Sequence, residues 1–185
     1  MDVPATTEKS PAKWGQTAAV SLSQVLPKKL EKHRTAETYL VPVDFSPASE
    51  VGLDYALKLA NEKNAHVILL HVIAAARIKR SEGTALDFYR LLKSEARENF
   101  SKVAKRKRLK PGKYQTVISR GLSPGVVIAK QAKKLKTDMI VMASHGRSGL
   151  QRLFLGSVAE TTLRLADCPV LIVKIIPQRK EVEKR

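Results

Sequence analysis

Glycine and serine residues gather between positions 143 and 158, where the sequence reads ASHGRSGLQRLFLGSV. Glycines allow tight turns and leave main-chain N–H groups accessible, and this segment holds Gly146, Gly149 and Gly156. Its serine hydroxyls and the guanidinium group of Arg147 are further donors that pair with phosphate. The segment therefore predicts a phosphate site, while a plain glycine-rich turn with Ser157 as a helix cap explains the same residues.

A second polar position, Asp44, follows the apolar run 39–43. A carboxylate or carbonyl at a strand end accepts hydrogen bonds from a base amino group or from ribose. The alternative is that Asp44 caps the turn before Ser46. The sequence has no convincingly spaced Ser/His/Asp triad, metal-ligand cluster or P-loop, so we assign no catalytic residue and no metal site. We expect His71, in an apolar strand, to be a hydrogen-bonded core residue.

Five short apolar runs alternate with four segments of helical periodicity. We expect strands at 39–43, 66–72, 114–119, 138–143 and 169–176, and helices that start near Ser46, Thr84, Ser123 and Ser157. In the first helix the spacing predicts a buried face made of Val51, Tyr55, Ala56 and Leu59. Strands that are almost continuously apolar indicate a parallel sheet with helices on both faces, a doubly wound α/β fold. Ligands bind such folds beyond the carboxyl ends of the strands, where Asp44 and the 143–158 segment fall.

The composition places the chain among basic, single-domain proteins. Its 185 residues include 34 Lys and Arg against 17 Asp and Glu, a net charge of +17. Residues 36–176 hold 24 of the basic and 12 of the acidic residues, so the charge belongs to the body of the chain and favours polyanionic partners. We expect 1–35 to be a disordered basic extension, 36–176 the folded domain and 177–185 a charged tail.

Several classes of protein are excluded. No apolar run approaches the roughly 18 residues of a membrane span. The single cysteine, Cys168, excludes an intramolecular disulfide framework. The first residues make a poor secretory signal, so we expect a cytoplasmic protein.

Seven cations fall within twelve residues near the end of the second helix: Lys102, Lys105, Arg106, Lys107, Arg108, Lys110 and Lys113. Cations are favoured at a helix C-terminus, so we interpret this cluster as a solvated helix end. Binding to a nucleic-acid backbone is the alternative, and it is less favoured because few aromatic residues lie between the cations.

The segment 143–158 resembles the universal stress proteins. Their nucleotide-binding members carry Gly, two residues, Gly, nine residues, then Gly-Ser or Gly-Thr; here Gly146 is followed by nine residues and then Gly156-Ser157. YLVPVDFS at the first strand, LLHV at the second and CPVLIV at the last extend the resemblance over residues 36–176. The first glycine of the pattern is Ala143, a change that would matter most if the position needed a positive φ.

The resemblance implies the strand order 3-2-1-4-5 of Rossmann-like, adenine nucleotide alpha-hydrolase-like folds. It also implies an ATP site, with or without Mg2+, and a stress-response sensor that forms a homodimer through the last strand, Pro169–Ile176. The implied nucleotide-binding residues are Pro42, Val43, Asp44, Val72, Met142, Ala143, Gly146, Arg147, Gly149, Gly156, Ser157 and Val158. Three alternatives stay open: a slow ATPase using His145 or Asp44, a dimeric interaction protein that has lost nucleotide binding, and a nucleic-acid-binding module.

Overall fold

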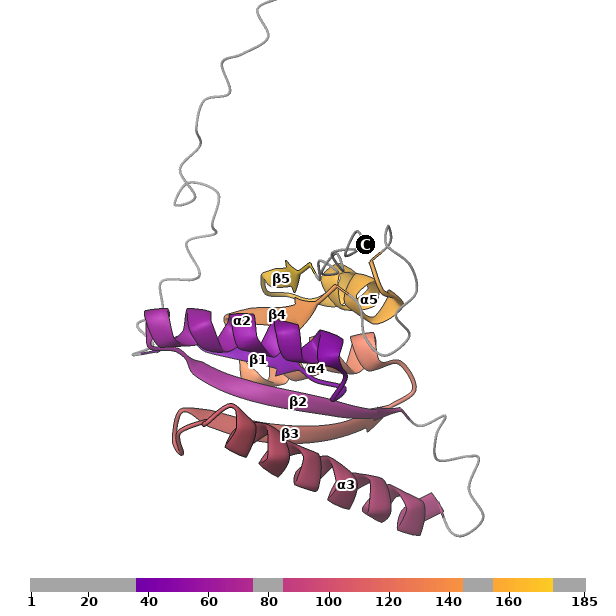
Figure 1. Cartoon of the computed structure of the whole chain (residues 1–185). Helices are drawn as coiled ribbons and strands as arrows, with labels where there is room; N and C mark the ends of the chain where they lie inside the picture. The colour runs from indigo at the N-terminus through magenta and orange to yellow at the C-terminus, as the bar shows by residue number, and fades with distance from the viewer. Residues whose placement is uncertain (1–35, 75–84, 145–154, 175–185) are drawn as a thin grey trace, which may run out of the picture. The chain divides into compact units, whose positions relative to one another are not determined.

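The computed structural model describes residues 36–74, 85–144 and 155–174, which form a five-stranded parallel sheet and four helices (Figure 1). In chain order the elements are β1 (Thr38–Pro42), α2 (Pro47–Lys63), β2 (His66–Ala74), α3 (Ala85–Arg106), β3 (Tyr114–Gly121), α4 (Pro124–Leu135), β4 (Met139–Ala143), α5 (Ser157–Leu165) and β5 (Val170–Val173). The sheet order is β3-β2-β1-β4-β5, and every pairing is parallel. This confirms the predicted fold class and strand order.

The winding of the sheet reverses at β1, which pairs with β2 on one side and β4 on the other. The register aligns Val41 with Leu69 across β1 and β2, and Leu40 with Ile140 across β1 and β4. Because the strands are parallel, the carboxyl ends of β1, β2 and β4 meet at one edge, where folds of this kind bind ligands.

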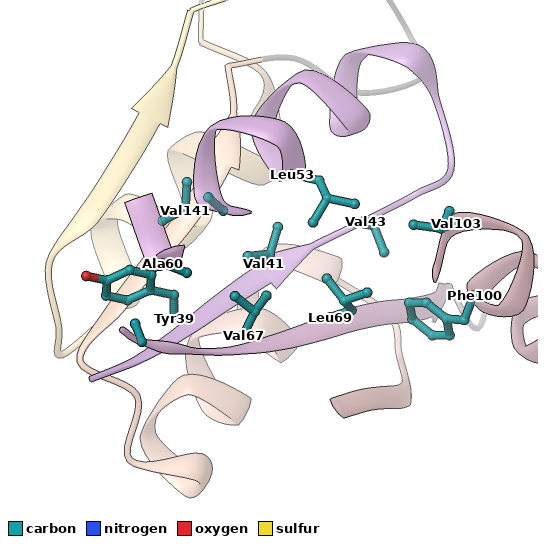
Figure 2. Close-up of a cluster of buried hydrophobic side chains, with 12 residues drawn as sticks. Tyr39, Val41, Val43, Leu53, Ala60, Val67, Leu69, Phe100, Val103 and Val141 are labelled. Carbon is teal, nitrogen blue, oxygen red and sulfur yellow. The ribbon is translucent and has the colours of Figure 1, made fainter. Parts of the chain in front are cut away.

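Each face of the sheet has its own apolar core. On one face α2 and α3 cover β1 and β2, and Figure 2 shows Leu53, Phe100 and Val103 packed with strand residues such as Val41 and Leu69. On the other face α4 and α5 contribute Ile128, Ala132 and Ala159 to a core with Leu40 and Ile140. Side chains that alternate along β1 therefore enter different cores, which explains why the strands are apolar on both faces.

Helix α2 begins as expected but buries a different face. Ser46 is the N-cap, its hydroxyl accepts a hydrogen bond from the N–H of Ser49, and Pro47 occupies the first turn. The predicted face was wrong at two positions, because Val51 and Tyr55 are 41% and 48% exposed. The buried face comprises Ser49, Gly52, Leu53, Ala56 and Ala60. Gly52 determines this rotation, since a Cβ there would lie 2.9 Å from the main-chain nitrogen of Ala143.

All five strands differ from the predicted ranges at one or both ends, and the largest difference is at the end of the last strand. The last strand ends at Val173, and Lys174 already lies outside it, so β5 is shorter than the predicted 169–176. Strand β3 is longer than predicted and ends at Gly121. Among the described residues, no helix combines the length and the hydrophobicity needed to cross a membrane.

Candidate functional site

A pocket of about 310 Å³ opens at the carboxyl edge of the sheet, where β1, β2 and β4 end and α4 and α5 begin. Its lining comprises Pro42, Val43, Asp44, Ser49, Leu70, His71, Val72, Pro124, Ile128, Met142, Ala143, Ser144, Gly156, Ser157, Val158 and Ala159. These residues come from six elements and their connections, so the pocket is a product of the fold and not of one loop.

Nine of the twelve residues predicted from the sequence line this pocket: Pro42, Val43, Asp44, Val72, Met142, Ala143, Gly156, Ser157 and Val158. The other three, Gly146, Arg147 and Gly149, lie outside the described residues, as do His145 and Arg152. The fold therefore brings all nine of the predicted residues that the structure describes to one pocket at this edge.

Six lining residues were not predicted as part of the site: Ser49, Leu70, His71, Pro124, Ile128 and Ala159. A seventh, Ser144, was expected only as one of the serine donors of the segment 143–158. A signal existed for Pro124, because Ser123-Pro124 starts a helix right after β3, at the same edge as the other strand ends. Leu70 could also have been predicted as a lining residue, because the parallel pairing of β1 with β2 places it beside Pro42. Ile128 lies one turn inside α4 and Ala159 lies in the first turn of α5, and only packing places these apolar side chains against the pocket.

Asp44 takes part in a turn as well as lining the pocket. Its Oδ1 accepts hydrogen bonds from the main-chain N–H of Ser46 at 3.1 Å and from the Ser46 hydroxyl at 2.5 Å. Ser49, which is buried, donates its hydroxyl to the carbonyl oxygen of Ser46 at 3.0 Å. The alternative reading of Asp44 as a capping residue is therefore observed, and the same bonds fix the residue at the pocket wall.

Ala143 has ordinary strand geometry. It is the last residue of β4, it pairs with Val173 of β5, and it is 7% exposed. The described non-glycine residues with positive φ are Phe45, Asn64, Arg108 and Lys136, so Ala143 is not one of them. The alanine is thus accommodated without backbone strain, although its methyl group still occupies space beside the pocket.

Two helix N-termini reach the pocket. Gly156 is the N-cap of α5, Ser123 is the N-cap of α4, and neither makes a side-chain capping bond. The first N–H groups of a helix have no intrahelical partner and carry a partial positive charge. The N–H of Gly156 donates to the carbonyl oxygen of Ser144 at 2.9 Å, which joins the start of α5 to the end of β4. The arrangement favours a ligand with a negatively charged end.

Three of the seven cations in the basic cluster near the end of α3 form ion pairs. Arg106 contacts Glu50 at 2.5 Å and Lys107 contacts Asp54 at 2.6 Å, so the last residue of α3 and the residue that follows it are both paired with α2. Lys102 pairs with Glu98 within α3 at 2.7 Å. These contacts support the interpretation of the cluster as a helix end and give no support to nucleic-acid binding.

Fold and pocket together define a doubly wound α/β protein with a pocket at the switch point of its sheet. Over residues 36–174 the sequence matches the model of the universal stress protein family. The chain belongs to this family.

Relatives and solved structures agree with this assignment. The chain is 36% identical to universal stress protein MJ0531 of Methanocaldococcus jannaschii over 137 residues, covering 73% of this chain and 80% of the relative. The structure of MJ0577 from the same organism matches with a TM-score of 0.68 at 32% identity, covering 77% of this chain and 99% of that one. A universal stress protein of Archaeoglobus fulgidus in complex with dAMP shares the fold, with a TM-score of 0.54 at 20% identity. The match covers 75% of this chain and 98% of that one.

Proposed function

We propose that this protein binds an adenine nucleotide, ATP, in the pocket and acts as a stress-response sensor whose bound and empty forms present different surfaces to partners. The observation that carries the proposal is a pocket of about 310 Å³ that joins apolar walls to the first turns of two helices. A nucleotide has this same division into an apolar base and a charged phosphate chain. We place this activity in the cytoplasm, in keeping with the single cysteine, Cys168.

The nucleoside would occupy the part of the pocket between β1 and β2. Apolar walls come from Leu70 and Val72 of β2, Met142 of β4 and Ile128 of α4, and such surfaces favour a flat purine ring. The carbonyl groups and the Asp44 carboxylate at the end of β1 would accept hydrogen bonds from the adenine amino group or from ribose.

The phosphates would lie at the start of α5. Main-chain N–H groups of Ser157 and Val158 and the Ser157 hydroxyl are the donors that this helix start offers, because the N–H of Gly156 already donates to the carbonyl oxygen of Ser144. Gly146, Arg147 and Gly149 complete the proposed phosphate site, on the strength of the sequence pattern alone. Among the described residues, no group of three His, Cys, Asp or Glu could hold a metal ion.

The dAMP complex of the Archaeoglobus fulgidus protein gives fold-level support only. At 20% identity the likeness extends to the fold and not to individual contacts. It nevertheless agrees with the proposal that a sheet of this topology can hold an adenine nucleotide.

We also propose that β5 forms a homodimer contact. It pairs with β4 on one side, and all four of its side chains are only partly buried. An edge strand exposes main-chain groups that a second copy can pair with. Analytical ultracentrifugation tests this part of the proposal: we expect a dimer at micromolar concentration, and a monomer would contradict it.

The nucleotide proposal is tested by denaturing the purified protein and identifying released small molecules by mass spectrometry, followed by calorimetric titration with ATP, AMP and GTP, with and without Mg2+. We expect ATP to bind and GTP to bind more weakly. A hundredfold excess of ATP over its dissociation constant should stabilise the fold by about 2.7 kcal/mol. If none of the three binds at millimolar concentration, the proposal fails and the alternative of a protein that works only through protein partners is favoured.

A further inference from the structure

The turn that follows β1 contains a residue in an uncommon backbone conformation. Phe45 has φ 62°, in the left-handed region that bulky side chains rarely adopt. It stands between Asp44, which lines the pocket, and Ser46, which caps α2. Surrounding contacts must hold this turn in place, because the backbone preference of phenylalanine does not.

His71 supplies one such contact from the neighbouring strand. Its Nδ1 lies 2.8 Å from the carbonyl oxygen of Val43. A carbonyl oxygen only accepts, so Nδ1 carries the proton and the neutral ring is the Nδ1–H tautomer. The N–H of Val43 in turn donates to the carbonyl oxygen of Leu70 at 2.8 Å. Val43 is therefore fixed at both its polar main-chain groups by consecutive residues of β2.

The imidazole ring also supports Phe45 directly. The centroids of the two rings are 4.6 Å apart, with 33° between their planes. Behind Phe45, the ring of Phe100 from α3 packs edge-on at 5.2 Å and 77°. His71 also lines a smaller cavity of about 40 Å³ beneath α3, together with Phe45, Glu95 and Asn99. His71 therefore lines both the larger pocket and this smaller cavity.

We propose that His71 is a positioning residue for the nucleotide site. It acts through Val43 and Phe45: its N–H holds the Val43 carbonyl and its ring supports Phe45, which keeps Asp44 at the pocket wall. His71 would therefore set the affinity for the nucleoside part of the ligand. The inference rests on the proposed nucleotide function and adds a residue to the same site.

Two substitutions separate the hydrogen bond from the ring. His71→Asn keeps an N–H donor near the position of Nδ1 but removes the ring, whereas His71→Phe keeps a ring against Phe45 and removes the donor. We expect His71→Phe to weaken ATP binding about tenfold, the effect of losing one buried hydrogen bond, and His71→Asn to retain most of the affinity. His66→Phe is the matched control, because His66 begins β2 at the opposite edge of the sheet.

Inorganic tripolyphosphate distinguishes positioning from general damage to the fold. It presents the phosphate chain without the nucleoside, so its affinity should be the same in the wild type and in His71→Phe. Provided that the wild type binds ATP, two results would overturn the inference. One is an equal loss of affinity for ATP and for tripolyphosphate in His71→Phe, and the other is an unchanged affinity of this variant for ATP. Failure of the wild type itself to bind ATP would instead overturn the proposed function, and this inference with it.

A spectroscopic measurement covers the case in which His71→Phe does not fold. Long-range 15N–1H correlation spectra of the wild type report which ring nitrogen is protonated. We expect the Nδ1–H tautomer for His71, and an Nε2–H tautomer would remove the hydrogen bond on which the inference depends.

Discussion

Gly156 and Ser144 are joined by a main-chain hydrogen bond of 2.9 Å at the mouth of the pocket, although they lie twelve positions apart in the sequence. Ser144 is itself fixed to β5, because its N–H donates to the carbonyl oxygen of Val173 at 2.9 Å. The start of α5 is therefore held against the end of β4. The helix start that we propose as the phosphate site is anchored to the sheet that supports the nucleoside.

The two Ser-Pro helix starts give a prediction with an internal control. The Ser46 hydroxyl accepts from the Ser49 N–H and contacts Asp44, whereas Ser123 makes no side-chain capping bond. Ser46→Ala should lower the free energy of unfolding by about 1 kcal/mol, and Ser123→Ala by clearly less. Urea denaturation measures both. Equal losses would show that the cap at Ser46 is not the source of the effect.

Gly52 is expected to resist substitution even though it lies inside a helix. Alanine in place of glycine normally stabilises a helix by about 1 kcal/mol. Here the added Cβ would lie 2.9 Å from the nitrogen of Ala143, so α2 would have to move away from β4. We expect Gly52→Ala to lower stability by about 1–3 kcal/mol and to weaken ATP binding. A higher melting temperature for this variant would contradict the close approach of the two backbones.

The ion pairs between α3 and α2 should contribute measurably to stability at low salt. The Lys107 side chain is only 18% exposed and lies 2.6 Å from Asp54. Lys107→Met should cost about 1 kcal/mol at low ionic strength and less at 1 M salt, where screening weakens the lost attraction. Lys105→Met, at an exposed position of the same helix, is the control and should have little effect. A cost that does not change with salt would argue for packing of the lysine stem instead.

Tyr39 should make the fold sensitive to alkaline pH. Burial, together with a hydrogen bond to the Glu37 carboxylate, raises the pKa of its phenol well above the ordinary value. In the unfolded chain the tyrosine loses this proton near pH 10, whereas the folded protein retains it to higher pH. The neutral phenol therefore contributes fully to the free energy of unfolding below pH 10, and this contribution is lost as the pH rises further.

An absorbance titration at 295 nm measures this effect, since the chain has only four tyrosines. One of them should ionise only when the protein unfolds. In Tyr39→Phe that tyrosine should be missing from the titration, and stability should fall less steeply above pH 10. Ionisation of all four tyrosines in the folded protein would contradict the predicted burial of Tyr39.

Apolar periodicity predicted the order and type of the elements because alternation and helical spacing directly reflect burial. It was wrong at two of the four positions predicted for the buried face of α2, because Val51 and Tyr55 are apolar residues at helical spacing that the fold leaves exposed. The true face is centred on Gly52, whose missing side chain lets α2 approach β4, and a hydrophobicity pattern does not register that property. The short β5 likewise depends on where pairing with β4 stops at Ala143.

The site was predictable where it is made of strand ends and a helix start. Asp44, Ala143 and Ser157 follow from the rule that ligands bind at the carboxyl edge. His71 was expected to be a hydrogen-bonded core residue, and it does have a partner, but it also lines the pocket. Which side of a buried strand faces a pocket depends on how the covering helices pack against it. That packing could not be predicted from the apolar pattern of a single sequence.

Calorimetric titration of ATP into Ser157→Asp tests the central claim most directly. Aspartate is favoured in the first turn of a helix, so the variant should fold, yet its charge would repel phosphates at the start of α5. Ser101→Asp, an exposed position on α3, is the matched control and should bind ATP like the wild type. We predict at least a tenfold loss of ATP affinity in Ser157→Asp alone, a difference of about 1.4 kcal/mol. Unchanged affinity in that variant would contradict the placement of the phosphates at this helix.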